Sequence, residues 1–159
     1  MFAARREGRD HCWIGRRSPD KAVDPGKLDN LVGGRIAAGM SVDETLRKEA
    51  WEEAGLAPSL LGNVNCAGAV RVEYSVPEGL HREILFVHDL WLPEDFKPAN
   101  HDGEVSEIRC LPVEEVMQNL LTGDFTLDAG VVMVDGLLRL GAVLPEDPQY
   151  LDLLRLMKP

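Results

Sequence analysis

The stretch from residue 33 to residue 56, GGRIAAGMSVDETLRKEAWEEAGL, constrains the fold most, because it joins a glycine turn to a helix with marked ends. Ser41 has the character of an N-cap, and Glu44 three residues later completes a capping box. Gly55 suits the left-handed position that follows the last turn of a helix. The sequence therefore predicts a helix over residues 42–54.

Three glutamates of this helix, Glu49, Glu52 and Glu53, fall within an arc of about 100° on its surface. The apolar stripe of the helix abuts them, whereas a solvated acidic face usually lies opposite the core. That stripe consists of Leu46, Ala50 and Ala54. The glutamates repel one another, and Lys48 gives only partial relief because it precedes Glu52 in the weaker order of an i, i+4 pair. A divalent ion that prefers oxygen ligands, Mg²⁺ or Mn²⁺, would supply the missing positive charge.

These residues stand at separations that resemble the Nudix box. The pattern here is Gly34-x5-Met40-x7-Lys48-Glu49-x2-Glu52-Glu53-x-Gly55-Leu56. The resemblance implies an α/β fold, the Nudix α/β/α sandwich with a mixed sheet and C-terminal helices, and metal-assisted attack of water on a diphosphate. It makes Glu49, Glu52 and Glu53 the metal ligands, with Glu52 and Glu53 also counted as catalytic. Gly34 belongs to the loop that wraps the metal and the phosphates, and we assign it to substrate binding.

Three positions depart from the usual pattern of the box. Met40 stands where the family usually has glutamate, Lys48 where it has arginine, and Arg35 where we expect glycine. Lysine can orient the neighbouring carboxylates only as a point charge, without the bidentate fork of arginine. We assign Lys48 to substrate binding. No central ligand is lost, so we expect activity to survive with altered metal or substrate handling.

A wider resemblance covers nearly all of the chain. The runs that carry it are WIGRRSPDKAVDPGKLDNLVGGRIAAGMS, KEAWEEAG, LHREILFVHDLWLP and HDGEVSEIRCLPVEEV. They look like a Nudix subfamily related to the portion fused to thiamine pyrophosphokinase in some fungi, and to plant plastid relatives, in which Met40-like and Lys48-like departures recur. This implies hydrolysis of damaged thiamine diphosphates, the oxo and oxy forms, to monophosphates. Family members often carry a further segment upstream, so we expect this chain to be the later part of a longer parent.

One acidic residue outside the box is a further catalytic candidate. Glu104 follows Asp102-Gly103 at the start of a predicted strand, where Nudix enzymes often place a carboxylate that binds metal or activates water. An exposed carboxylate at a strand edge is an equally good interpretation, and Glu107 is an alternate that fits the register less well. The sequence does not decide whether Glu53 or Glu104 accepts the proton.

Three cationic residues lie nearest the start of the box. Arg16, Arg17 and Lys21 could hold a diphosphate by charge-assisted hydrogen bonds, or they could form a solvated strand end. Three aromatic residues could stack on a substrate ring or belong to the core, and these are Trp13, Tyr74 and Phe86. The histidines show no ligand spacing and are expected to be structural or surface residues. They are His11, His81, His88 and His101.

The rest of the chain predicts a mixed sheet with helices on both faces. Apolar alternation predicts two strands within residues 2–17 and others over 28–32, 63–76, 80–92 and 104–111, with a hairpin turn at 77–79. Helices are predicted over 113–121, 128–140 and 145–157. We expect one Nudix domain over residues 1–159, with a C-terminal helical part from residue 126.

Composition restricts the partners. A formal net charge of −10 argues against binding a nucleic-acid backbone, so the expected partner is a small-molecule diphosphate. Cys12, Cys66 and Cys110 are odd in number and form no CxxC pair, which favours reduced thiols, with Cys12 and Cys66 buried in strands. With no leader and no apolar run of membrane-spanning length, we expect a cytoplasmic protein without a membrane partner. A homodimer is compatible with this sequence.

Three alternatives remain beside the thiamine diphosphate hypothesis. The chain could hydrolyse nucleoside diphosphate derivatives. An isopentenyl-diphosphate isomerase shares the fold but needs a catalytic cysteine in a loop, whereas all three cysteines here are predicted in strands. A Nudix module that binds a diphosphate without cleaving it is conceivable because of Met40, although the three central glutamates argue against it.

Overall fold

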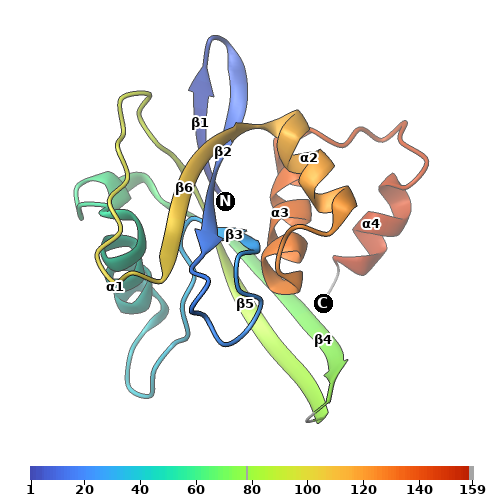
Figure 1. The fold of residues 1–159 in the computed structure, drawn as a ribbon. Coiled ribbons are helices and arrows are strands. Elements are labelled where there is room, and N and C mark those ends of the chain that lie inside the picture. The colour runs from blue at the N-terminus through green and yellow to red at the C-terminus, as the bar shows by residue number, and fades with distance from the viewer. Residues whose placement is uncertain (78, 158–159) are drawn as a thin grey trace.

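A computed structural model describes residues 1–77 and 79–157, and it contains a mixed sheet between two helical layers. The strands are β1 (Phe2–Arg6), β2 (Arg9–Arg17), β3 (Leu28–Asn30), β4 (Asn65–Val76), β5 (Gly79–Trp91) and β6 (Val105–Pro112). The helices are α1 (Val42–Ala54), α2 (Val113–Thr122), α3 (Leu127–Leu140) and α4 (Tyr150–Leu156), with a 3₁₀ turn, η1 (Leu60–Asn63). Figure 1 shows α1 on one side of the strands and the other three helices on the opposite side. The predicted α/β/α sandwich is confirmed.

β2 is the strand on which the sheet is assembled. β6 pairs antiparallel with one edge of it from His11 to Arg17, while β1 and then β3 pair antiparallel with successive parts of the other edge. β5 joins β1 in parallel, and β4 joins β5 antiparallel, so the sheet is mixed. β3 comes before α1, and β6 comes after the β5–β6 loop. Because both strands pair with β2, this strand places the segment before α1 close to the end of that loop.

The alternation of side chains along β2 divides the core in two. Cys12 and Ile14 pack into the cluster beneath α2 and α3, and Trp13 packs into the cluster beneath α1. Ala50, Ala54 and other residues of the predicted apolar stripe fill this second cluster. The predicted period of two in β2 is confirmed, and it fixes α1 against one face of the sheet.

Several boundaries differ from the sequence predictions. The last helix begins at Tyr150 and not at residue 145, because Pro148 has no N–H to donate and disfavours helical geometry in the residue before it. Residues 145–148 instead form turns, in which the Leu144 N–H donates to Asp147 Oδ2 at 2.7 Å. The long hairpin of β4 and β5 forms as predicted, while Glu78, at the centre of its expected turn, lies outside the described residues. Within the described part of the chain, none of the helices combines the length and apolar character that a membrane crossing requires.

The three cysteines all lie in strands, as predicted, but they differ in burial. Cys12 is fully buried in β2, and burial raises the pKa of its thiol to about 12. Cys66 is exposed, so the expectation that it is buried is wrong. It lies beside a register shift between Cys66 and Gly68 at the edge strand β4, which interrupts the alternation of buried and exposed positions.

This difference predicts selective thiol labelling. Iodoacetamide at pH 8 should alkylate Cys66 in the native protein, whereas Cys12 should react at least about a thousandfold more slowly because it is buried and almost entirely protonated. Mass spectrometry of peptides after timed quenching measures both rates in one sample. Unfolding in urea should remove the difference, and equal native rates at the two thiols would contradict the burial of Cys12.

Candidate active site

The ends of α1 are fixed by the caps that the sequence predicts. The Glu44 N–H donates to Ser41 Oγ at 3.2 Å, and the Ser41 N–H donates to Glu44 Oε2 at 2.8 Å. Gly55 ends the helix with φ +66°. The capping box and the left-handed C-terminal glycine are confirmed, and together they set which way the glutamates of α1 face.

Glu53 is the buried carboxylate of the site. Its residue is only 8% exposed, and the Gly33 N–H donates to its Oε2 at 2.7 Å. Burial raises the pKa of Glu53 to about 8; the Gly33 hydrogen bond opposes this rise, and the charges of Asp29, Glu49 and Asp102 add to it. A carboxylate that is buried among other carboxylates is stabilised in its charged form by a cation.

The loop between β5 and β6 attaches to the last turn of α1. The final carbonyls of a helix have no partner within it. Here the Ala99 N–H donates to Ala54 O at 3.1 Å, and the His101 N–H donates to Glu52 O at 2.7 Å. The His101 ring also stacks on Trp51, with centroids 4.7 Å apart. These contacts hold the end of the loop beside Glu53.

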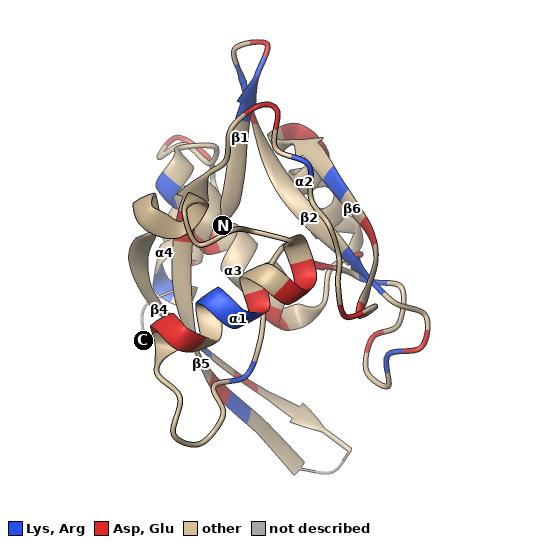
Figure 2. Ribbon diagram, turned by 90° about the vertical axis from the view of Figure 1, so that its left-hand side faces the viewer, with Lys and Arg blue, Asp and Glu red and all other residues tan. Residues whose placement is uncertain are grey.

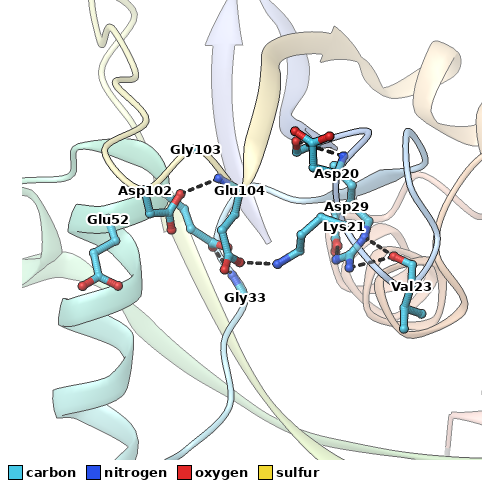
Figure 3. Close-up of polar contacts among 12 residues, drawn as sticks. Asp20, Lys21, Val23, Asp29, Gly33, Glu52, Asp102, Gly103 and Glu104 are labelled. Carbon is cyan, nitrogen blue, oxygen red and sulfur yellow. Dashed lines mark hydrogen bonds and ion pairs between the residues drawn. The ribbon is translucent and has the colours of Figure 1, made fainter.

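That attachment brings two loop carboxylates to the helix. Oxygen atoms of Glu53, Asp102 and Glu104 all lie within 4.8 Å of one another. The Glu104 N–H donates to Asp102 Oδ1 at 2.8 Å, and Lys21 pairs with the Glu104 carboxylate (Figure 3). Oxygen ligands of an octahedral Mg²⁺ stand about 3.0 to 4.2 Å apart for bonds of about 2.1 Å. The observed limit of 4.8 Å is somewhat wider, so the three carboxylates would move slightly closer together to hold a hard divalent ion.

Asp102 is the member of this group that the sequence analysis did not assign. Its signal is its position in the run Asn100-His101-Asp102-Gly103-Glu104, a turn ahead of a strand. In the structure this run is a side-chain-capped turn, since the Gly103 N–H donates to Asn100 Oδ1 at 2.7 Å. Glu107, the alternate to Glu104, lies outside the group and pairs with Arg16 at 3.4 Å.

The other two glutamates of the box are paired with lysine. Lys48 Nζ donates to Glu49 Oε1 at 3.1 Å and to Glu52 Oε2 at 2.6 Å, so it relieves their repulsion more than the sequence suggests. Glu52 extends away from Asp102 and Glu104 in Figure 3. Of the three predicted metal ligands, Glu53 therefore meets the loop carboxylates, while Glu49 and Glu52 share Lys48.

Gly34 lies against the side chain of Glu49. A Cβ atom at this position would lie 2.7 Å from Glu49 Oε1 and closer still to the Glu49 Cδ. Only glycine lets the loop approach the helix so closely. Arg35, the departure next to it, is 88% exposed, and its guanidinium lies 3.5 Å from Glu83 Oε1.

The three predicted cations surround a small hollow beside Glu53. Arg16, Arg17 and Lys21 line a space of about 60 Å³ together with Glu53 and Glu104. Arg17 is already engaged, because it donates to Asp29 Oδ2 at 2.7 Å and to the carbonyl of Val23, which lie to the right of Lys21 in Figure 3.

Arg16 is engaged as well, because its Nη1 donates to the Gly26 carbonyl at 2.7 Å and its Nε lies 3.4 Å from Glu107 Oε2. It is 39% exposed and also lines a larger hollow of about 350 Å³ with Lys27 and Arg109. Figure 2 shows Lys and Arg interspersed with Asp and Glu on α1, β6 and the β1–β2 hairpin. Positive charge is therefore mixed with negative charge on these elements, and the cations nearest Glu53 are the three that line the hollow.

The aromatic candidates separate by burial. Trp13 is 5% exposed and packs edge-on against Phe96 with centroids 5.4 Å apart, so it belongs to the core. Phe86 is 50% exposed. The ring of Tyr74 lies against His81, with centroids 4.6 Å apart.

The attachment of the loop predicts an unusual cost for substituting Gly55. Gly55→Ala should lower the free energy of unfolding by about 1 to 2 kcal/mol for the left-handed backbone and further for the clash, because the new Cβ would lie 2.9 Å from Ala99 O. Gly141→Ala is the matched control, since Gly141 also ends a helix at φ +75° but has open space around it. Urea denaturation measures both variants. Equal losses would show that Gly55 and Ala99 are not in close contact.

The pKa of Glu53 predicts how stability depends on pH in the presence of a chelator. The folded chain retains a proton on Glu53 up to about pH 8, whereas the unfolded chain releases it near the ordinary glutamate pKa of 4.5. The free energy of unfolding of the wild type should therefore fall, relative to Glu53→Gln, as the pH rises between these values, by at most about 1.4 kcal/mol per pH unit. Urea titrations of both proteins in EDTA measure the difference. A difference that does not change with pH would mean that Glu53 ionises normally.

Comparison with known proteins places this geometry in a family. A match to the NUDIX domain covers residues 1–131. Nudix hydrolase 24, chloroplastic, of Arabidopsis thaliana is 42% identical over 154 residues, which are 96% of this chain and 42% of that protein. Nudix hydrolase 20, chloroplastic, of the same plant is 40% identical over 149 residues, which are 93% of this chain and 40% of that protein. The chain thus spans less than half the length of these relatives.

Solved structures agree with the fold. The NUDIX domain of Shewanella oneidensis NrtR, complexed with ADP ribose, superposes with a TM-score of 0.69 at 14% identity. The superposition covers 87% of this chain and 83% of that one. The domain match, together with the capped helix that carries Glu49, Glu52 and Glu53, shows that the chain belongs to the NUDIX family.

Proposed function

We propose that this chain is the catalytic domain of a metal-dependent hydrolase that cleaves a diphosphate linkage. The observation that carries the proposal is the group of Glu53, Asp102 and Glu104 at the end of α1, with Arg16 and Lys21 beside it. The group joins carboxylates that suit a metal ion to cations that suit a phosphate. The names of both plant relatives, Nudix hydrolases, support hydrolysis as the reaction.

The oxygen donors present suit Mg²⁺ or Mn²⁺. Glu53, Asp102 and Glu104 would hold the ion, with Glu49 and Glu52 as the further ligands that the box implies. Such an ion supplies neutralisation of phosphate charge and activation of water. Lys48 pairs with Glu49 and Glu52 and would hold their carboxylates in place.

Two carboxylates are suited to accept the proton of the attacking water. Burial raises the pKa of Glu53 to about 8 in the metal-free chain, and a bound cation would lower it and so leave the carboxylate ionised to accept a proton. The Gly33 N–H fixes the orientation of this carboxylate. Glu104 is half exposed and is held by Lys21. Both remain candidates. Arg16 would bind the phosphate by charge-assisted hydrogen bonds, and Lys21 would orient Glu104 or join Arg16 on the phosphate.

For the substrate, we propose damaged thiamine diphosphates, the oxo and oxy forms, cleaved to monophosphates. The support is the resemblance of segments on both sides of the box to the subfamily related to fungal thiamine pyrophosphokinase fusions, including Met40 and Lys48. Nucleoside diphosphate derivatives are the competing class. A single domain over residues 1–159, a cytoplasmic location and a homodimer all stay predictions.

The positions of the cysteines favour hydrolysis over isomerisation. An isomerase of the isopentenyl-diphosphate type needs a cysteine in a loop, and Cys12, Cys66 and Cys110 lie in β2, β4 and β6. Hydrolysis of a thiamine diphosphate to the monophosphate releases inorganic phosphate, which an isomerase does not. Product analysis therefore separates the two reactions.

The proposal predicts a large loss of activity on removing one carboxylate. Glu53→Gln should lower kcat by about a hundredfold or more for the loss of the base or ligand, with the fold intact by circular dichroism. The assay separates and quantifies the phosphorylated products by chromatography, with oxo- and oxythiamine diphosphate, thiamine diphosphate, ADP-ribose and nucleoside triphosphates as substrates, and with Mg²⁺ and with Mn²⁺. Glu146→Gln is the matched control and should retain activity, because Glu146 is exposed in the turn before α4 and lies outside the group.

Three outcomes would overturn parts of the proposal. Wild-type turnover by Glu53→Gln at saturating Mg²⁺ would remove Glu53 from the mechanism. Cleavage of ADP-ribose in preference to every thiamine derivative would reject the substrate class. Binding of a diphosphate without cleavage under any metal would identify a non-catalytic module.

A further inference from the structure

A second group of ligating side chains lies where the first turn of α3 meets β5. His81 and Glu83 are two residues apart on β5 and share a face, and Asp128 is the second residue of α3. His81 Nε2 lies 3.5 Å from Glu83 Oε1 and 3.8 Å from Asp128 Oδ2. We propose that these three side chains form a binding site for a divalent transition-metal ion, separate from the carboxylates beside Glu53.

Two atoms of this group lack the partners that buried polar atoms normally have. Among the residues that the structure describes, His81 Nε2 and Asp128 Oδ1 are buried without a hydrogen-bond partner. Most buried polar atoms in proteins are hydrogen-bonded, so each exception calls for an explanation. Burial raises the pKa of Asp128, and the negative charge of Glu83 raises it further. A cation between the three side chains would satisfy the imidazole nitrogen and offset both carboxylates.

The separations suit an ion that accepts imidazole and carboxylate together. Tetrahedral ligands with bonds of about 2.0 to 2.2 Å stand about 3.3 to 3.5 Å apart. The two measured separations, 3.5 and 3.8 Å, exceed this range by only a few tenths of an ångström at most. Imidazole nitrogen favours Zn²⁺ and its transition-metal neighbours over Mg²⁺, which prefers oxygen ligands. Zn²⁺ is therefore the appropriate probe for this site, and Mg²⁺ for the site beside Glu53.

The surroundings hold the ligands in place. Tyr74 is the cross-strand neighbour of His81 on β4, and its ring packs against the imidazole. Arg35 contacts Glu83 Oε1, the oxygen that faces His81, but its side chain is 88% exposed and readily displaced. An ion bound here would join the β4–β5 hairpin to α3. The site would thus fasten the edge of the sheet to its helical layer.

The test uses the full chain, labelled for NMR and saturated with Mg²⁺, to which Zn²⁺ is added. The His81 imidazole resonances, identified by their loss in His81→Ala, should move and reach their end point at one equivalent of Zn²⁺. Zn²⁺ at about a hundredfold above its Kd should also raise Tm by about 5 °C or more. Because the imidazole resonances report on one site, Zn²⁺ bound to the exposed thiol of Cys66 does not imitate the result.

Variants with and without the ligands complete the test. His81→Ala and the isosteric Asp128→Asn should both lose the rise in Tm, and Asp128→Asn keeps the test valid if His81→Ala does not fold. His11→Ala should retain it, since the His11 ring contacts the Arg9 carbonyl away from these carboxylates. Unmoved His81 resonances at one equivalent of Zn²⁺ would overturn the proposal. So would a rise in Tm that both ligand variants retain. No hydrolysis is measured, so the result is independent of the proposed activity.

Discussion

Two backbone amides of the β5–β6 loop complete the hydrogen bonding at the end of α1, and the candidate active site depends on them. The carbonyls of Glu52 and Ala54 would otherwise need water or a cap, and they bind His101 and Ala99 instead. The same contacts deliver Asp102 and Glu104 to Glu53. The last carbonyls of every helix need hydrogen-bond donors from outside the helix. In this chain the donors that meet this need also bring together carboxylates that lie some fifty residues apart in the sequence.

Some carboxylates of the site are paired with a lysine that the structure describes, and Glu53 is not. Lys48 lies between Glu49 and Glu52 on the exposed side of α1. Glu53 is buried, and Lys21 pairs with Glu104 and not with Glu53. The remaining need for positive charge therefore concentrates at Glu53, where the pKa of the carboxyl is raised most clearly. A divalent ion bound at this point would lie beside Arg16, which lines the same hollow.

The sequence predicted most fully what depends on neighbours in the chain. The capping box, the extent of α1, the left-handed Gly55 and the alternation along β2 follow from local patterns, and each is confirmed. The apolar spacing predicts a last helix that is too long, because Pro148 prevents the helix from starting at residue 145. The burial of Cys66 was wrong because a bulge shifts the register of an edge strand, which a period of two does not show.

Contacts between distant segments escaped the sequence for a physical reason. Glu53, Asp102 and Glu104 meet only through the backbone bonds of one loop, and His81 meets Asp128 only because α3 packs on β5. Hydrophobic periodicity carries no information about such contacts between distant side chains. Spacing along the chain shows no ligand pattern for the histidines. It does not reveal that His81 and Glu83, on one strand, meet a third partner on a helix 45 residues further on.

The candidate active site takes its carboxylates from two kinds of support. Three of them, Glu49, Glu52 and Glu53, lie on a capped helix that packs on the core. The other two, Asp102 and Glu104, lie at the end of a loop whose backbone is hydrogen-bonded to that helix at Ala99 and His101. Phe96, three residues before Ala99, packs edge-on against Trp13 in the core beneath α1, so the segment that leads to this attachment is anchored as well. A loop held at both points places Asp102 and Glu104 almost as firmly as the helix places Glu53, so the site needs little rearrangement before it can hold an ion.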